Sequence, residues 1–378
     1  MGTSDSLGII APQLYTCCEP LSLVCGKQLE GFDLVFETYG ALNTSHSNAV
    51  LICHALSGDH HAAGYHGVDD KKPGWWNSCI GPGKAIDTNK FFVVSLNNLG
   101  GCAGSTGPLS INPTTGVAFG PDFPQVTVCD WVESQRRLAV HLGIEKFAAI
   151  IGGSLGGMQV MEWATRHPQW LHSAVVIAAA SKLSAQNIAF NEIARQAIVT
   201  DREYQDGHYR RGESFPERGL GLARMLGHVT YLSDDGMKAK FDRALKSGDL
   251  TLATKVEFQV ESYLHHQAAN FSKSFDANTY ILMTRALDLY NAAGNFDDDL
   301  TKAFAESSCR YLVISFSSDW RFSPGRSKEI VDALVAAKKD VTSVNIESVH
   351  GHDSFLLPIP RYLDVLAGFL NRLAGNLT

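Results

Sequence analysis

Several features that would place this chain in other protein classes are missing from it. No apolar run approaches the roughly 18–20 residues that a membrane-spanning helix needs, so we expect no membrane association. The 32 Lys and Arg residues are outnumbered by 39 Asp and Glu, giving a net charge of −7, and this argues against a nucleic-acid partner. The first fifteen residues, MGTSDSLGIIAPQLY, lack a basic start and an apolar core, so we expect no signal peptide.

The eight cysteines form no C-x-x-C pair and no regular framework. In a chain of 378 residues, this pattern indicates reduced thiols in a cytoplasmic protein. The sequence also contains no internal repeat and no low-complexity tract. Its length suits one α/β domain that carries a large insertion.

Short apolar runs alternate with stretches of helical periodicity. Each run is rich in β-branched or small apolar residues and is bounded by Gly, Ser, Asn or Asp, as expected of buried parallel strands. The six runs are NAVLICHAL (48–56), KFFVVSLNN (90–98), KFAAIIGGS (146–154), HSAVVIAAA (172–180), RYLVISFSSD (310–319) and VTSVNIESV (341–349). Helices are expected between them, for example at 127–143 and 327–339. This alternation predicts an α/β fold with a doubly wound, mostly parallel sheet.

The alternation stops between residues 182 and 305, where no convincing strand occurs. Stretches such as QNIAFNEIARQAIV and FDANTYILMTRALDLY have helical periodicity instead. We therefore expect a core domain made of 1–181 and 306–378, with 182–305 inserted as a helical lid over the site.

One serine, Ser154, stands among four glycines in IGGSLGGM, directly after a predicted strand and before a predicted helix. Gly152–Gly156 fits G-x-S-x-G, which in this context predicts a nucleophile elbow. Glycines surround such a serine because larger side chains would clash at the sharp turn. A glycine-rich turn without catalysis is the alternative.

A serine nucleophile needs a base and an orienting acid, and in this fold the chain order is Ser, acid, His. Asp319 ends one predicted strand, and His350 and His352 follow the next. All three are therefore expected at the carboxyl ends of parallel strands, where catalytic loops lie. The spacing leaves both histidines open as the base. For the oxyanion hole we expect the backbone N–H groups of Leu56, in the loop HALSG, and of Leu155.

Two other stretches look like binding motifs. HHAAGYH holds His60, His61 and His66, but a zinc site would usually include Cys or carboxylate partners, so we predict no metal. NNLGGCAGSTGP (97–108) lacks the Lys-Ser/Thr ending of a P-loop, and we expect a tight turn packed beside the site.

Longer motifs give the chain a specific resemblance. GGSLGGMQ, LNNLGGCAGSTGP, GLARMLGHVTYLS, SSDWRFSP and GHDSFLLPIP together resemble the homoserine O-acyltransferases, which are α/β-hydrolase-fold enzymes of methionine biosynthesis. The resemblance extends from about residue 34 to residue 370. It implies Ser154 as nucleophile, Asp319 as acid and His352 rather than His350 as base, and it implies a homodimer.

The resemblance also implies which residues hold the amino acid substrate. Arg224 takes the position that binds the carboxylate of L-homoserine, and Asp353 the position that binds its ammonium group. The chemistry agrees, because a guanidinium forms bidentate pairs with carboxylates. Tyr231 is a weaker candidate for the same pocket, with a core tyrosine as the alternative.

The acyl donor in this family is acetyl-CoA or succinyl-CoA. Succinyl carries an extra carboxylate, which needs a cation when it is bound away from water. Arg321 lies two residues after Asp319. The resemblance implies that succinyl-using members of the family carry arginine at this position, whereas acetyl-using members have an apolar residue there. We therefore expect succinyl-CoA as co-substrate and no cofactor, with a loop-fixing role for Arg321 as the alternative.

The expected reaction is ping-pong transfer through an acyl-serine. The alternatives left open are a homoserine O-acetyltransferase, a serine O-succinyltransferase, a hydrolase that uses the same triad, and a binding module without chemistry. The serine alternative is hard to separate, because one methylene changes binding by only about 1–3 kcal/mol.

Overall fold

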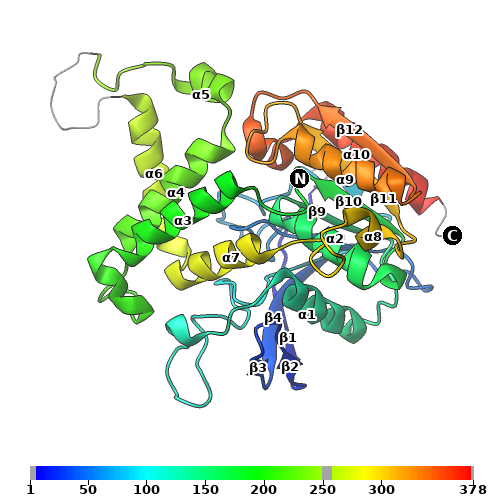
Figure 1. The fold of residues 1–378 in the computed structure, drawn as a ribbon, viewed down its shortest axis with the longest axis horizontal. Helices are drawn as coiled ribbons and strands as arrows, with labels where there is room; N and C mark the ends of the chain where they lie inside the picture. Colours follow the sequence, from blue (N-terminus) through cyan, green and yellow to red (C-terminus); the bar gives the residue numbers. More distant parts are fainter. Residues whose placement is uncertain (1–5, 249–257, 376–378) are drawn as a thin grey trace.

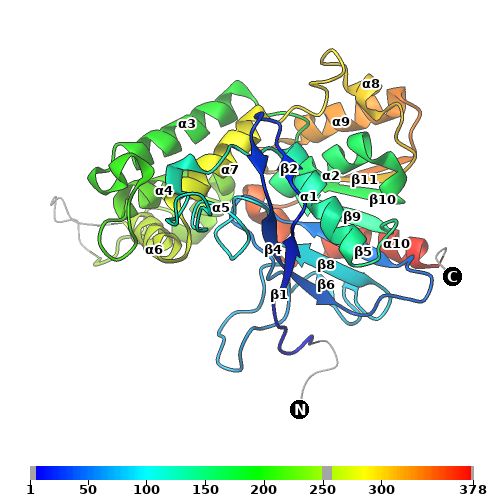
Figure 2. The ribbon, with the colours of Figure 1, turned by 90° about the horizontal axis from the view of Figure 1, so that it is seen from below.

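The computed structural model describes residues 6–248 and 258–375, and its centre is an eight-stranded sheet (Figures 1 and 2). In spatial order the strands are β1 (Gln13–Cys17), β4 (Phe32–Tyr39), β8 (Phe92–Leu96), β5 (Ala49–Cys53), β9 (Ala149–Gly153), β10 (Ser173–Ile177), β11 (Arg310–Phe316) and β12 (Val341–Ile346). Neighbours from β8 to β12 are parallel, whereas β4 pairs antiparallel with both β1 and β8. Two minor sheets pair β2 (Leu21–Ser22) with β3 (Gln28–Leu29) and β6 (Ile80–Gly81) with β7 (Ile86–Asp87).

All six predicted strands are present, and the prediction of a mostly parallel α/β sheet is confirmed. The antiparallel strands β1 and β4 were not predicted. Burial alternates along much of β4, which lies next to the parallel part of the sheet, and β1 is mostly exposed because it lies at the sheet edge. They therefore lack the continuous apolar run that marks the central strands.

Helices cover both faces of the sheet, as a three-layer α/β fold requires. One face carries α1 (Val128–His141), α2 (Leu155–Arg166), α8 (Leu300–Phe304) and α9 (Pro324–Ala336), which share a core with the sheet. The other face is covered by α10 (Pro360–Ala374) and by the segment 62–86, through side chains such as Trp76, Tyr362 and Leu366.

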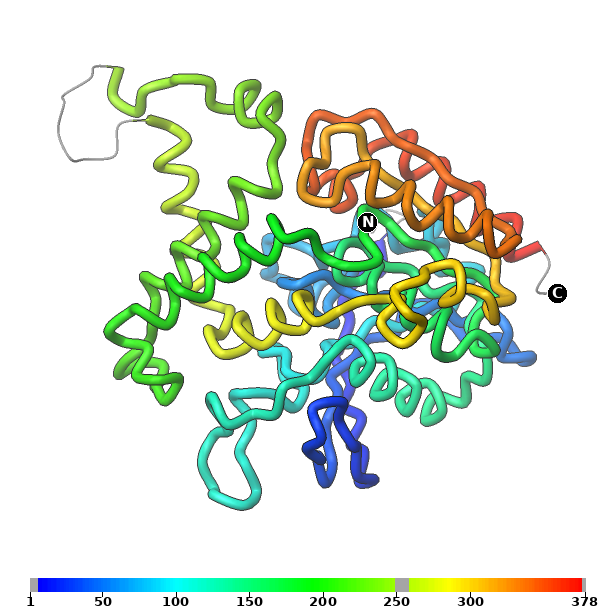
Figure 3. Tube along the Cα trace, viewed as in Figure 1, coloured from blue at the N-terminus to red at the C-terminus, as the bar shows by residue number. Residues whose placement is uncertain are grey.

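Among the described residues, six α-helices lie between β10 and β11, and all of them except α8 lie to one side of the sheet (Figures 1 and 3). The helices to one side are α3 (Ala185–Val199), α4 (Glu217–Tyr231), α5 (Asp234–Phe241), α6 (Gln259–Ser274) and α7 (Ala277–Leu289). Ile198, Leu220, Phe271 and Tyr280 contribute to a small apolar core of their own. No strand occurs among the described residues of 182–305, and residues 249–257 of that expected insertion lie outside them.

Short 3₁₀ helices complete the fold. They are η1 (Gly120–Asp122), η2 (Pro168–Trp170), η3 (Arg202–Gly207) and η4 (Gly351–Leu356). Within 6–248 and 258–375, no helix has both the length and the apolar character needed to cross a membrane.

Candidate active site

Ser154 occupies a strained turn between β9 and α2. Its φ of 57° and ψ of −123° lie outside the regions that L-residues favour. A Cβ added to Gly152 would lie 2.3 Å from the Gly156 carbonyl carbon, and one on Gly156 would lie 2.0 Å from Cys53 O. The glycines are therefore required by backbone packing around the serine, in agreement with the elbow geometry expected from the sequence.

Ser154, His352 and Asp319 form a continuous hydrogen-bonded chain. His352 Nε2 lies 2.9 Å from Ser154 Oγ, and His352 Nδ1 lies 2.7 Å from Asp319 Oδ2. Because a carboxylate only accepts, Nδ1 carries the proton and Nε2 is left to accept from the serine hydroxyl. All three residues are buried. The arrangement has the geometry of a serine nucleophile, a general base and an orienting acid.

The two histidines that spacing alone left open are placed differently. His350 is exposed, and its side chain is not part of this chain of hydrogen bonds. The His352 ring packs instead against Phe322 and Phe355, with ring centroids 4.9 and 5.5 Å away. The structure therefore brings His352, and not His350, to Ser154.

The two expected oxyanion donors are placed at the ends of β5 and β9. Leu155 is the first residue of α2, where backbone N–H groups have no partner inside the helix. Leu56 lies in the loop that follows β5. Both residues therefore lie at the positions in the fold from which the sequence predicted their N–H groups to act.

A buried polar network, which the sequence did not reveal, fixes the loop of Leu56. His54 Nε2 accepts from the Asn98 N–H at 3.1 Å, so its Nδ1 donates to Ala55 O at 2.7 Å. Burial lowers the pKa of His54 and keeps the ring neutral, as this tautomer requires. Gln159 on α2 donates to His54 O and accepts from the Asn98 side chain. The network thus ties this loop to the helix that follows Ser154.

The only signal for this network in the sequence is the presence of polar side chains inside the motifs LNNLGG and GGSLGGMQ. The same network holds the glycine-rich segment 97–108 in place through Asn98. As expected, this segment packs beside the site.

Arg224, from α4, reaches the same loop. Its Nη1 lies 3.5 Å from Ser57 Oγ, its guanidinium carbon lies 4.5 Å from the Phe271 ring centroid, and its Nε is buried without a hydrogen-bond partner. A cavity of about 150 Å³ lies here, lined in part by Leu56, Ser57 and Arg224. Its size suits a small polar ligand.

Asp353 follows directly after His352 on η4. Desolvation raises the pKa of its carboxyl above the ordinary value, and the charges of His352 and Arg224 partly oppose the shift. A bound ammonium group would favour the charged form of this carboxylate. The placement is compatible with the role that the resemblance implied.

Arg321 is held by two helices of the segment between β10 and β11. It donates to Thr230 Oγ1 on α4 at 2.7 Å and to Asn191 Oδ1 on α3 at 3.2 Å. Its guanidinium carbon lies 5.3 Å from the Tyr231 ring centroid, and that ring lies 6.1 Å from the His352 ring. Tyr231 thus lies between Arg321 and the base.

Arg224 and Arg321 share one further property. Among the described residues, neither forms an ion pair with a carboxylate within 4.0 Å, in contrast to Arg195, which is paired with Glu192 and Asp288. Two cations without anionic partners beside a serine triad make this region suited to a ligand with carboxylate groups.

The three histidines of HHAAGYH lie around Glu37 of β4. Glu37 Oε1 lies 2.5 Å from His66 Nε2 and 3.1 Å from His61 Nδ1, and His60 Nε2 is 3.8 Å away. From the sequence, no metal was expected because no carboxylate partner of these histidines was evident, but Glu37 is such a partner. Glu37 escaped notice because it lies on the unpredicted strand β4.

A family model that describes the alpha/beta hydrolase fold matches residues 48–356. The chain belongs to the α/β-hydrolase fold family, and the elbow and triad geometry are those of its serine-nucleophile members. The crystal structure of an esterase shares this fold at a TM-score of 0.86 and 30% identity, over 96% of this chain and all of that one.

Individual relatives show to which family within the α/β-hydrolase fold the chain belongs. A protein from Litchfieldella anticariensis named homoserine O-succinyltransferase is 62% identical over 99% of this chain and 96% of its own. A protein of the same name from Pseudomonas fluorescens is 61% identical over 98% of both chains. The crystal structure of homoserine O-acetyltransferase from Bacillus anthracis matches with a TM-score of 0.89 and 29% identity, covering 96% of this chain and 98% of that one. Within the α/β-hydrolase fold, the chain belongs to the homoserine O-acyltransferases.

Proposed function

We propose that the chain transfers the succinyl group of succinyl-CoA to the hydroxyl of L-homoserine, giving O-succinyl-L-homoserine and CoA. The high identity to relatives named homoserine O-succinyltransferase, over nearly the whole chain, supports this function. The roles that we propose for the residues of the site in each half of the reaction are as follows.

In the first half, Ser154 attacks the thioester carbonyl while His352 Nε2 takes the hydroxyl proton. The developing oxyanion is stabilised by the backbone N–H groups of Leu56 and Leu155. When the C–S bond breaks, His352 returns the proton to the sulfur of CoA, and a succinyl-serine ester remains. Asp319, 2.7 Å from His352 Nδ1, orients the ring and stabilises its charged form.

In the second half, L-homoserine binds with its carboxylate on Arg224 and its ammonium group on Asp353. His352 then takes the proton of the substrate hydroxyl, which attacks the ester carbonyl. The bond to Ser154 breaks, and its oxygen recovers the proton from His352. This order of events predicts ping-pong kinetics.

The observation that carries the choice of succinyl is the environment of Arg321. Its guanidinium is fixed by Thr230 and Asn191 and has no carboxylate partner among the described residues, while Tyr231 connects it to His352. A positioned, unpaired cation close to the triad suits the distal carboxylate of a succinyl group. An acetyl group has no such carboxylate.

Release of CoA tests this proposal. Purified protein with L-homoserine is expected to use succinyl-CoA strongly in preference to acetyl-CoA, and Arg321→Leu is expected to remove that preference. The matched control is Arg326→Leu, because Arg326 is ion-paired with Glu329 on α9 outside the site. If the wild type prefers acetyl-CoA, the succinyl assignment is wrong, and homoserine O-acetyltransferase takes its place.

The same assay distinguishes the proposed enzyme from a serine O-succinyltransferase, a hydrolase and a binding module. A serine O-succinyltransferase would release CoA faster with L-serine than with L-homoserine. A hydrolase would release CoA at the same rate without an amino acid. A binding module would be unaffected by Ser154→Ala, whereas the proposed enzyme loses its activity.

The setting of the reaction is part of the same proposal. We place the enzyme in the cytoplasm, in methionine biosynthesis, as a homodimer that needs no cofactor. The segment 182–305 acts as a lid that favours attack by homoserine over attack by water. Size-exclusion chromatography with light scattering tests the dimer.

A further inference from the structure

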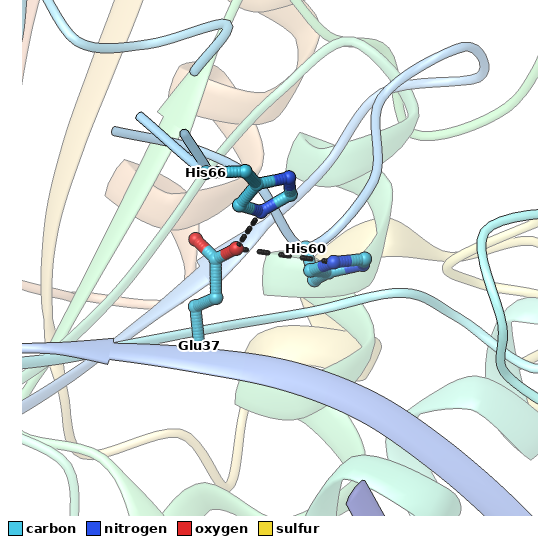
Figure 4. A group of neighbouring side chains, drawn as sticks. All are labelled: Glu37, His60 and His66. Atoms are coloured by element: carbon cyan, nitrogen blue, oxygen red, sulfur yellow. Dashed lines mark hydrogen bonds and ion pairs between the residues drawn. The ribbon is translucent and has the colours of Figure 1, made fainter. Parts of the chain in front are cut away.

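We infer that Glu37, His60 and His66 form a binding site for a divalent transition metal ion of the zinc class. Figure 4 shows the three side chains converging, one from β4 and two from the loop that follows β5. Nothing in the proposed acyl transfer uses them. The site is thus a property of the chain that holds whether or not the proposed function does.

The donor atoms lie close to the separation that a metal ion imposes. One donor atom from each residue lies within 4.8 Å of the other two, with 2.5 Å between His66 Nε2 and Glu37 Oε1. Zinc bonds of about 2.0–2.2 Å in tetrahedral geometry place neighbouring donors about 3.3–3.5 Å apart. Binding therefore needs donor shifts of roughly 1 Å, which the His66 side chain, 40% exposed, can make.

His60 is placed to provide the third ligand. It is buried, and its Nε2 lies 3.8 Å from Glu37 Oε1, which is beyond hydrogen-bond distance. Two donors bound to one zinc ion lie about 3.3–3.5 Å apart, so the separation of these two atoms is close to the one that a metal ion between them would set.

Glu37 is positioned as metal-binding carboxylates are. It is fully buried, and Tyr39 donates to its Oε2 at 2.6 Å. The Tyr39 oxygen in turn accepts from the N–H groups of Ala62 and Ala63 at 2.9 and 3.2 Å, and His61 contacts the carboxylate from the side. Such outer contacts fix the orientation of a ligating carboxylate. Oε1 is thereby directed toward His60 and His66.

The donor set is characteristic. Two histidines and one carboxylate with a further position open to water is a known arrangement for zinc in proteins. Since His66 is partly exposed, an ion can enter from solvent and keep a water ligand. A bound ion would fasten the segment 59–66 to β4, next to the loop that carries Leu56.

Zinc binding to the full chain tests the inference. After treatment with a chelator, the protein is titrated with Zn²⁺ against a chromophoric competitor. The wild type is expected to bind one tight equivalent. Since changing even the outer contacts of a metal site costs about 10–100-fold in affinity, Glu37→Gln and His66→Ala are each expected to weaken binding by at least about 10-fold. His208→Ala, at an exposed histidine outside the cluster, is expected to bind as the wild type does.

Cobalt gives a second, spectroscopic readout that reports the coordination of the ion directly. Co²⁺ added to the wild type is expected to produce visible d–d absorption, and His66→Ala is expected to lose it. Equal zinc affinity in the wild type and His66→Ala would overturn the inference, as would the absence of a tight equivalent in the wild type. The half-exposed position of His66 makes this variant a safe one for folding.

Discussion

Asp353 combines two opposing demands on a single side chain. Desolvation raises the pKa of its carboxyl above the ordinary value of 3.8, so burial disfavours the charged form that is proposed to bind the substrate ammonium. Since folding raises this pKa, the charged group lowers stability at pH values above the ordinary pKa. This loss of stability disappears as the pH falls below the ordinary pKa of the carboxyl.

We therefore predict that Asp353→Asn raises the melting temperature at pH 7, and that the gain shrinks toward pH 4. The same variant is expected to raise the KM for L-homoserine. In the wild type that KM is expected to rise as the pH falls toward the raised pKa, whereas in the variant it stays high and flat. Thermal unfolding and initial rates measure the two effects. Asp364→Asn, at an exposed position on α10, is the control and is expected to change neither.

Sequence reasoning could reach the candidate triad residues because they follow apolar strands in a fixed order. It left His350 and His352 open, because two residues of spacing do not determine which ring faces inward. The polar network of His54, Asn98 and Gln159 was out of reach. Its members lie on three separate elements, and only the tertiary structure brings them together.

The turn between β9 and α2 has no room for a side chain at Gly156. A Cβ on Gly156 would lie 2.0 Å from Cys53 O, which is a backbone atom of β5 and cannot rotate away. α2 would have to move off the strand, and the N–H of Leu155 would move with it. A displacement of about 1 Å at such a donor costs on the order of 100-fold in rate.

Gly156→Ala is therefore predicted to lower kcat/KM by about 100-fold or more and to lower the melting temperature. Gly368→Ala is the matched control. Gly368 lies inside α10 with nothing within 4 Å of an added Cβ, so the better helix propensity of alanine should stabilise the protein by about 0.5–1 kcal/mol. A Gly156→Ala protein of wild-type activity would refute the packing argument.

Among the elements, β5, β8, β9, β10 and β11 were predictable because central parallel strands are buried on both faces, and β12 was predicted as well although it lies at the sheet edge. β4 was not predicted, because burial alternates along much of it. Since Glu37 lies on β4, its place beside the histidines was not predicted either. The metal-site inference therefore depends on a strand that only the structure revealed.

At the scale of the whole molecule, the proposed acyl pocket is built from two parts of the chain. Arg321 follows β11 in the sheet domain, whereas its partners Thr230 and Asn191 lie on α4 and α3. The position of the guanidinium thus depends on how the helices between β10 and β11 sit on the sheet.

We predict that Thr230→Val, which keeps the side-chain shape but removes the acceptor, lowers kcat/KM for succinyl-CoA by about 10-fold, because a hydrogen bond to a charged group contributes about 1.5–3 kcal/mol. The kcat/KM for acetyl-CoA is expected to change by less than about two-fold, because an acetyl group has no distal carboxylate to bind. Thr200→Val, at an exposed threonine at the end of α3, should affect neither substrate. A parallel loss with both donors would mean that Thr230 only supports the fold.

The late position of α10 in the chain has a consequence for synthesis on the ribosome. β1 to β10 are complete at residue 177, but the helix that covers much of one face of the sheet begins only at Pro360. At about 5–20 residues per second, the nascent sheet waits roughly 10–40 s for that cover. Throughout this interval the apolar side chains that share a core with α10, including Trp76 and Ile80 of the segment 62–86, are open to other nascent chains and to chaperones. The period of greatest aggregation risk for this enzyme therefore falls before its chain is released.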